Sequence, residues 1–314
     1  MCIFTQPVIS VNNTQIFARS SGTGTQFLAY QMNYESSDQN AMILPLPIKR
    51  PSNDKSLKFI DLKDYDEFFD ELADGFPFHS PPSIGCSAPF DPASRHDLEV
   101  FEVGNYIASF VPTIPDFDRL DSKFKLPNEI WQTISGYNEF GFAVFQLAAG
   151  SLKPHPMAFE FHSANADLFF PTIHIHDGEI HESEEFDHVL YMQHAGLDSR
   201  VYGYRNSHVA DKSTGLIRSK YVASQFCDVD KSAGLVDGNL LLHRKIVRGN
   251  LPNTDTTFTF AGDPLKPTLN LRPLLSYTPW LIVLAGIGWF FNRRSTIKKM
   301  RELKSTSTDD EIAT

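Results

Sequence analysis

The sequence predicts an α+β fold, mainly antiparallel β-sheet with a few short helices, followed by one C-terminal transmembrane helix. Many stretches before residue 265 alternate apolar and polar residues, which is the period of a strand with one buried face. A long segment near the C-terminal end carries no charged side chain. The predicted organisation is a globular α+β domain at residues 1–265, a linker at 266–272, a transmembrane helix at 273–291, and a basic, then acidic tail at 292–314.

The first fifty residues are typical of strands. "TQIFARS" (14–20) and "QFLAYQMNYES" (26–36) alternate, and the glycine-containing stretch "SSGTGT" (20–25) between them indicates a turn. "AMILPLPIKRP" (41–51) continues as an extended apolar segment, and its prolines indicate an edge strand or an exit from the sheet.

Two short helices are expected among the strands. In "LKDYDEFFDELADG" (62–75), one helical face carries four apolar side chains, and Gly75 ends the helix. "LPNEIWQTISG" (126–136) has a proline in its first turn and a glycine after its end. Further strands are expected at "LEVFEVGNYIASFVP" (98–112), "FGFAVFQLAAGS" (140–151) and "HPMAFEFHS" (155–163). The proline-rich residues 76–94 are predicted to be a loop, and irregular polar sequence is expected after the histidine-rich stretch 170–194, to about residue 265.

Composition excludes some classes of function. With 41% hydrophobic residues, the chain can bury a substantial core, and its 26 phenylalanines suit a β-rich interior. The formal net charge of −10 argues against a nucleic-acid partner, because phosphate binding needs a basic face. Three cysteines, Cys2, Cys86 and Cys227, are too few for a disulfide framework.

The apolar segment 273–291, "PLLSYTPWLIVLAGIGWFF", predicts the lipid bilayer as a partner. Nineteen helical residues rise about 28 Å, close to the thickness of a hydrocarbon core. Trp280 and Trp289 are placed for the two membrane interfaces. The alternative is a buried C-terminal helix of a soluble domain, which the absence of a polar face disfavours.

The sequence gives two opposing indications of the side on which the domain lies. The basic residues after the span place the tail in the cytoplasm and the domain outside, by the positive-inside rule. The opening "MCIFTQPVISVNN" has neither the basic nor the apolar region of an export signal. The expected localisation is therefore a single-pass membrane protein with its orientation open.

Eight of the eleven histidines fall between His155 and His208. Within "PTIHIHDGEIHES" (171–183), Asp177-Gly178 predicts a two-residue type I′ turn joining two strands. In that register one face carries His174, His176, Glu179 and His181, and the other carries Ile173, Ile175 and Ile180.

Three imidazoles and a carboxylate on one face suit zinc or another divalent metal, so this hairpin is the candidate metal site. Asp187, His188 and His194 could form a second shell around it. The alternative is that the isoleucines face the core while the polar face is only solvated.

Cys2 is a second candidate site. Removal of Met1 would leave its thiol beside a free α-amine, the arrangement in which an N-terminal residue acts as nucleophile and its own amine as base. "MCIFTQPVISVNNTQIFAR" resembles the opening hairpin of the N-terminal nucleophile hydrolases, and the resemblance implies a role for Arg19. Ser20, Ser21 and Gly22 stand where that superfamily has an aspartate. The alternative is that Cys2 is a small buried residue at the start of a strand.

Cys86 lies in the proline-rich loop with His79 and His96 nearby in sequence. No recognised nucleophile spacing connects the three, so an inert cysteine is expected.

The order of several segments carries a broader resemblance: Cys2-Ile3-Phe4, "NAMILPLPI", "FEVGNYIASFVP", "WQTISGYNEFGFAVFQL", "HPMAFEF" and "LFFPTIHI". Followed by an anchor with a basic tail, this order resembles the bacterial membrane proteins grouped as domain of unknown function 2330. The resemblance implies a membrane-anchored domain and no particular chemistry. The predicted function is a membrane-tethered binding or structural protein of unknown ligand that could hold a metal at the histidine hairpin, and the alternative is an amidohydrolase using Cys2.

Overall fold

The computed structural model describes residues 3–76, 100–103, 106–121, 124–126, 130–131, 135–200, 210–211 and 214–258. The chain divides into two compact units, Met1–Thr268 and Leu269–Thr314, and all described residues belong to the first. Several predicted features lie outside the described residues: Cys2, Cys86, His79, His96, the linker at 266–272, the membrane helix at 273–291 and the tail at 292–314. Within the described ranges, no helix combines the length and apolar character that a membrane crossing requires.

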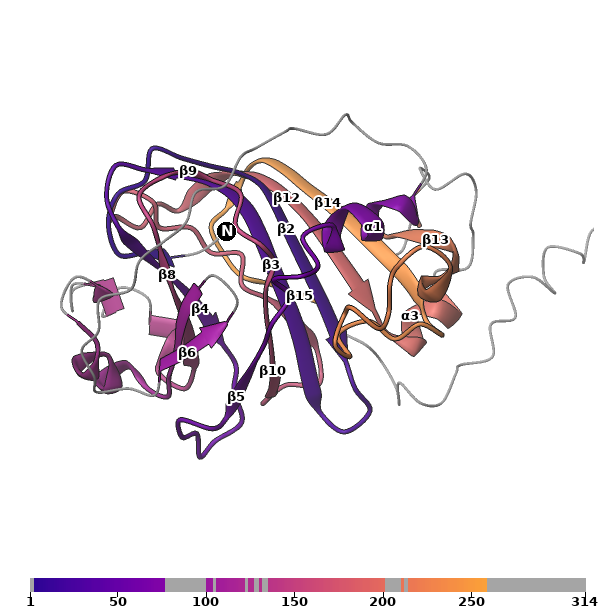
Figure 1. Cartoon of the computed structure of the whole chain (residues 1–314), viewed down its shortest axis with the longest axis horizontal. Coiled ribbons are helices and arrows are strands. Elements are labelled where there is room, and N and C mark those ends of the chain that lie inside the picture. Colours follow the sequence, from indigo (N-terminus) through magenta and orange to yellow (C-terminus); the bar gives the residue numbers. More distant parts are fainter. Residues whose placement is uncertain are drawn as a thin grey trace, which may run out of the picture. The chain divides into compact units, whose positions relative to one another are not determined.

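The first unit consists mostly of antiparallel strands with few helices, as the sequence predicts (Figure 1). The larger sheet has eight strands, ordered β13-β14-β12-β2-β3-β10-β5, with β9 also paired to β3. Its only parallel pair in the described part of the chain joins β12 to β2. These strands are β2 (Ser10–Ser20), β3 (Thr25–Ser36), β5 (Leu57–Ile60), β9 (Gly150–Leu152), β10 (Met157–His162), β12 (Ser183–Gln193), β13 (Ile217–Val222) and β14 (Leu241–Pro252).

A second sheet has five strands in the order β1-β4-β8-β7-β6, and a two-stranded ladder joins β11 to β15. These strands are β1 (Ile3–Phe4), β4 (Asn40–Leu46), β6 (Val100–Val103), β7 (Tyr106–Val111), β8 (Gly141–Leu147), β11 (Leu168–Phe170) and β15 (Thr256–Phe258). The helical elements are α1 (Phe68–Asp74), α3 (Ala195–Arg200) and the short 3₁₀ turns η1 (Ile114–Arg119), η3 (Ser135–Tyr137) and η4 (Ala223–Gln225).

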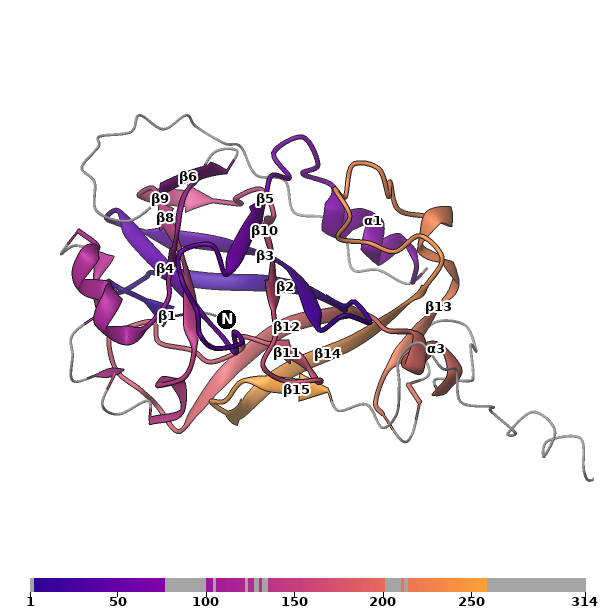
Figure 2. The ribbon, with the colours of Figure 1, turned by 90° about the horizontal axis from the view of Figure 1, so that it is seen from below.

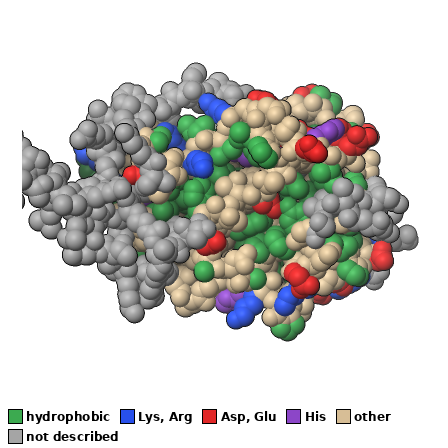
Figure 3. Space-filling view, turned by 180° about the vertical axis from the view of Figure 1, so that it is seen from behind, with side chains coloured by type: hydrophobic (Ala, Val, Ile, Leu, Met, Phe, Trp, Pro, Cys, Tyr) green, Lys and Arg blue, Asp and Glu red, His purple; other side chains and the backbone are tan. Residues whose placement is uncertain are grey.

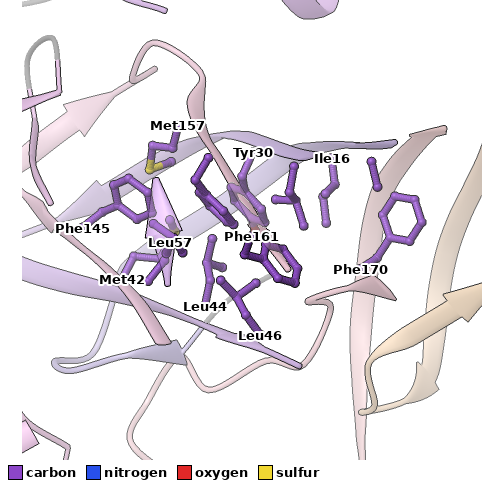
Figure 4. Packing of buried hydrophobic residues seen from close by; sticks show 14 of the residues in the cluster. Ile16, Tyr30, Met42, Leu44, Leu46, Leu57, Phe145, Met157, Phe161 and Phe170 are labelled. Carbon is purple, nitrogen blue, oxygen red and sulfur yellow. The ribbon is translucent and has the colours of Figure 1, made fainter. Parts of the chain in front are cut away.

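A central hydrophobic cluster contains residues from both larger sheets, as the close view shows (Figure 4). Strict alternation along each strand makes this possible, since successive side chains point to opposite faces. On β2, for example, Ile16 and Ala18 belong to the central cluster, whereas Phe17 belongs to a cluster on the opposite face.

That opposite face of the eight-stranded sheet is covered by α1 and by the segment between β13 and β14. Figures 1 and 2 both show α1 beside this orange segment. The contact is polar as well as apolar, because the hydroxyl of Tyr65 bonds to the Glu71 carboxylate and lies 3.2 Å from the sulfur of Cys227. Burial raises the pKa of the Cys227 thiol to about 11, so it is an inert packing residue.

The predicted hairpin of residues 14–36 and the amphipathic face of α1 are both confirmed. Phe68, Phe69 and Leu72 are buried on one side of α1, together with Tyr65 just before it. Figure 3 shows the molecule from behind, where hydrophobic side chains gather across the middle of the described surface.

Two expectations about strands are wrong. For residues 41–51 the edge strand is the wrong alternative, because β4 lies between β1 and β8, whereas the exit from the sheet is correct, because β4 ends at Leu46, just before Pro47. The region after residue 194, which was expected to be irregular, contains β13, β14 and β15, and β14 pairs with β12 over ten successive positions. Most residues of β14 are half-buried or exposed, so its sequence lacks a clear apolar face, and its stability comes from the long ladder with β12.

Candidate histidine site

The histidine-rich segment does not form the predicted hairpin. Residues 171–182 contain no ladder of their own, and the backbone groups of the first half bond elsewhere. Ile175 forms a parallel bridge with Ile3, and its carbonyl accepts a hydrogen bond from the Phe4 N–H at 3.1 Å. Asn253 binds both backbone groups of His174, at 2.7 Å to the N–H and 2.8 Å to the carbonyl. These tertiary partners replace the cross-strand partners that a hairpin would supply.

A turn forms at Asp177-Gly178, but it is not the predicted type I′ turn, because that type needs a positive φ at both central residues and Asp177 does not have one. The Asp177 carboxylate accepts hydrogen bonds from the Glu179 N–H at 3.0 Å and from the His181 ring at 2.9 Å. Gly178 has a φ of 87°, a backbone conformation that favours glycine. The result is a compact polar turn held by one aspartate side chain.

Three imidazoles meet at the inner side of this segment: His174, His176 and His188. The ring centroids of His174 and His176 are 5.1 Å apart in a stacked arrangement, and those of His174 and His188 are also 5.1 Å apart. The Nε2 atoms of His174 and His188 are separated by 3.3 Å. Phe186 packs against both of these rings. We call this group the histidine cluster.

The strand β12 brings His188 into the cluster. Phe186, His188, Leu190 and Met192 occupy alternate positions of β12 and are all buried. Leu190 and Met192 belong to the central cluster between the sheets, so His188 points to the same side. The sequence signal for His188 was therefore the alternation of Phe186, His188, Leu190 and Met192, which lies beyond the predicted hairpin.

Burial determines the charge of the cluster. His174 and His188 are completely buried and His176 is half-buried. Loss of hydration lowers the pKa of all three rings, to about 4 for His176 and further for the other two. The rings are therefore neutral at pH 7, the form in which imidazole binds metals.

Several polar atoms around the cluster are buried without a hydrogen-bond partner among the described residues. They are Nδ1 of His174, Nε2 of His176 and the hydroxyl of Thr14, which lies directly across from His188 on β2. Orphaned polar atoms are costly in a protein interior, and a concentration of them indicates that water or an ion completes the site.

The remaining candidate ligands do not join the cluster. Glu179 and His181 are exposed on the turn, and Asp187 is half-buried and paired with Arg248 at 3.0 Å. His194 is buried, and its Nδ1 accepts a hydrogen bond from the Gly196 N–H at the start of α3. Among the residues that the structure describes, no three His, Cys, Asp or Glu side chains could hold a metal ion as they stand.

Ile173 and Ile175 are buried, and Ile180 packs against the same hydrophobic cluster on the outer face of the five-stranded sheet. The three isoleucines therefore face the core, as the alternation of the sequence predicted.

The side chain of Arg19 makes contacts that hold the fold together. Its guanidinium donates to the backbone carbonyls of Leu235 and Gly234, at 2.6 and 2.5 Å, and lies 4.2 Å from the ring centre of Phe27. Burial lowers its pKa. In the parallel pairing of β2 with β12, Arg19 lies opposite Gln193, five positions along the strand from the Thr14–His188 pair. Arg19 ties the end of β2 to the segment before β14.

No protein-family model matches the chain, and no curated protein matches it significantly. Solved structures with some similarity include the crystal structure of baculovirus P35, with 11% identity and a TM-score of 0.42 over 83% of this chain and 100% of that chain. The caspase-8/P35 complex has 15% identity and a TM-score of 0.39, over 79% of this chain and 96% of the matched chain. TM-scores of this size do not establish a shared fold.

Proposed function

We propose that this protein is a membrane-tethered binding module whose β domain holds a divalent transition metal at the histidine cluster. His174 and His188 are the two primary ligands in this proposal. The observation that carries it is the 3.3 Å separation of their Nε2 atoms inside a buried, uncharged site.

That separation suits shared coordination of one ion. Two nitrogens bound to a tetrahedral zinc at about 2.0–2.1 Å lie about 3.3–3.4 Å apart. The same distance also fits a hydrogen bond in which one neutral ring donates to the other, so the metal content distinguishes the two states. His176 would become a third ligand by turning its ring, and its buried Nε2 has no competing hydrogen bond among the described residues.

The test measures metal in the full-length protein purified in detergent. We expect about one equivalent of zinc or a related metal by elemental analysis, and a higher melting temperature than after chelation, because an ion that binds only the folded state stabilises it. His188→Gln should abolish retention of the metal. The matched control, His181→Gln, removes an exposed imidazole from the same segment and should retain it.

A metal-free preparation whose melting temperature does not change on addition of zinc would refute the proposal. Substitution with cobalt gives an independent measurement, since tetrahedral nitrogen coordination produces visible absorption that a structural hydrogen bond would not.

The tether of this proposal is the apolar segment 273–291. The full-length chain should remain with the membrane fraction after lysis and be released by detergent, whereas a chain ending at residue 265 should not. Protease treatment of intact cells then reports the orientation. Recovery of the full-length chain in the soluble fraction without detergent would refute the tether.

Amidohydrolase activity at Cys2 is the second candidate. The observation that favours it is the pairing of Ile3, the next residue in the chain, with Ile175, which is flanked by the neutral imidazoles of His174 and His176. Intact mass shows whether Met1 is removed, and a thiol-directed acylating probe tests the reactivity of Cys2 against that of Cys2→Ala. A retained Met1 excludes this candidate.

A further inference from the structure

A polar pocket of about 390 Å³ lies beside the ends of several strands that contribute to the central cluster. Three strand ends surround it: β4 ends at Leu46, β5 begins at Leu57 and β10 ends at His162. The turn between β2 and β3 completes the wall. The residues that line it are Thr23, Gly24, Ile48, Lys49, Arg50, Pro51, Ser56, His162 and Ser163. None of these belongs to the histidine cluster.

Backbone hydrogen bonds hold the walls of the pocket in place. The Lys49 N–H donates to the His162 carbonyl at 2.8 Å, and the Ser163 N–H donates to the Gly24 carbonyl at 3.0 Å. Ile48 and Ser163 form an antiparallel bridge. Each of the three segments is thus tied to another, so the pocket is formed before any ligand enters.

The charge of the pocket is positive in a chain of net charge −10. Lys49, Arg50 and His162 contribute basic groups, and the described lining contains no carboxylate. The Arg50 guanidinium is held by the carbonyls of Pro112, Asn138 and Phe140, at 3.2, 3.3 and 3.2 Å. Its Nε lies 3.7 Å from the exposed Glu139 carboxylate, so Arg50 is a fixed cation whose charge is partly offset, and Lys49 is the cation that remains for a ligand.

Lys49 differs from Arg50 because it is exposed and forms no ion pair within the described residues. Its ammonium group can turn toward a ligand. Three hydroxyl side chains, Thr23, Ser56 and Ser163, supply further polar groups. Fixed charge, a mobile ammonium and hydroxyls together match the requirements of a small oxyanion.

We propose that this pocket binds a small anionic ligand through a phosphate-like group, with Lys49 as the principal contact. The inference is independent of the metal proposal, because the two sites share no residue and rest on different observations.

The test is calorimetric titration of the full-length protein in detergent with inorganic phosphate, at constant ionic strength. We expect saturable binding that weakens at least about tenfold in Lys49→Gln, because the substitution removes a charge-assisted hydrogen bond to the anion. The control is Lys55→Gln, which removes the same charge from an exposed position nearby that does not line the pocket. It should bind phosphate as the unaltered chain does.

His162→Gln provides a second variant within the pocket and should also weaken binding. Two results would overturn the proposal: absence of saturable phosphate binding, or equal weakening by Lys49→Gln and Lys55→Gln, which would indicate only general electrostatic attraction. Retention of zinc is measured separately and is unaffected by either result.

Discussion

The two halves of the histidine-rich segment have similar residues and opposite environments. In the first half, the His174 ring packs against both His176 and His188, and the rings of His174 and His176 are uncharged at pH 7. In the second half, His181 is exposed and pairs with Asp177, which raises the pKa of its imidazole. Residue type alone thus does not determine the role of a histidine here, because its partners and its exposure to water decide its charge.

Two side chains that follow β14 create the difference. Asn253 binds the backbone of His174, and Asp255 accepts hydrogen bonds from the backbone N–H groups of Thr172 and Ile173, at 2.8 and 3.1 Å. The hydroxyl of Tyr137 bonds to the same carboxylate at 2.5 Å. Between His176 and His181 the chain turns outward on the local bonds of Asp177, and Asn253 holds the backbone again at the His181 carbonyl, at 3.1 Å.

Of the changes considered, acidification should have the largest effect on stability, and it should act on the buried half of the segment. In the unfolded chain these imidazoles bind protons below their ordinary pKa of 6.5. In the folded state they are buried and stay neutral until about pH 4 or lower. Their stabilisation is therefore complete above pH 6.5 and is lost as the pH falls through this window. Each ring contributes up to about 1.4 kcal/mol per pH unit to this loss.

Urea unfolding between pH 7 and pH 4.5 measures this slope. His188→Gln should have a slope lower by about one proton, or about 1.4 kcal/mol per pH unit. His181 contributes to the pH dependence of stability with the opposite sign, because its pKa is raised in the fold. Its contribution stabilises the fold below pH 6.5 and is lost as the pH rises through the pKa of the folded state. An unchanged slope in His188→Gln would show that its ring is already protonated in the fold.

Asn253→Ala should have the next largest effect. It removes bonds to the N–H and carbonyl of His174 and to the His181 carbonyl, and leaves buried backbone groups of His174 without partners. We expect a loss of about 2–4 kcal/mol in the free energy of unfolding. Chemical denaturation measures it, with Asn33→Ala as control, since among the described residues the Asn33 side chain bonds to Asn12 alone, in an exposed pair. Equal effects of the two substitutions would mean that Asn253 does not anchor the buried half.

His181→Ala should have the smallest effect. Its ring is exposed and its single described bond is to Asp177, a surface pair that water screens. We expect a melting temperature unchanged within experimental error at pH 7. A large decrease in the melting temperature would mean that His181 shares a site with the buried rings, as the predicted four-ligand hairpin requires.

The local features of the fold were readable from the sequence. Alternation along residues 14–36 predicted β2 and β3, and the apolar face of residues 65–72 predicted α1. The same reasoning placed Ile173 and Ile175 in the core. It failed for β14, whose exposed polar residues are stabilised by pairing with a strand about sixty residues earlier. It also failed for the hairpin, because Ile3 and Asn253 compete for the backbone of residues 174–175.

By itself, the sequence determined that this chain builds alternating strands, concentrates histidine in one segment and carries a long uncharged stretch near its end. Period and composition are local properties, and they persist in any arrangement of the strands. Only the tertiary structure decided which histidines meet. His188 reaches His174 because β12 inserts between β2 and β14, and burial there removes the water that would otherwise keep these rings chargeable at moderately acid pH.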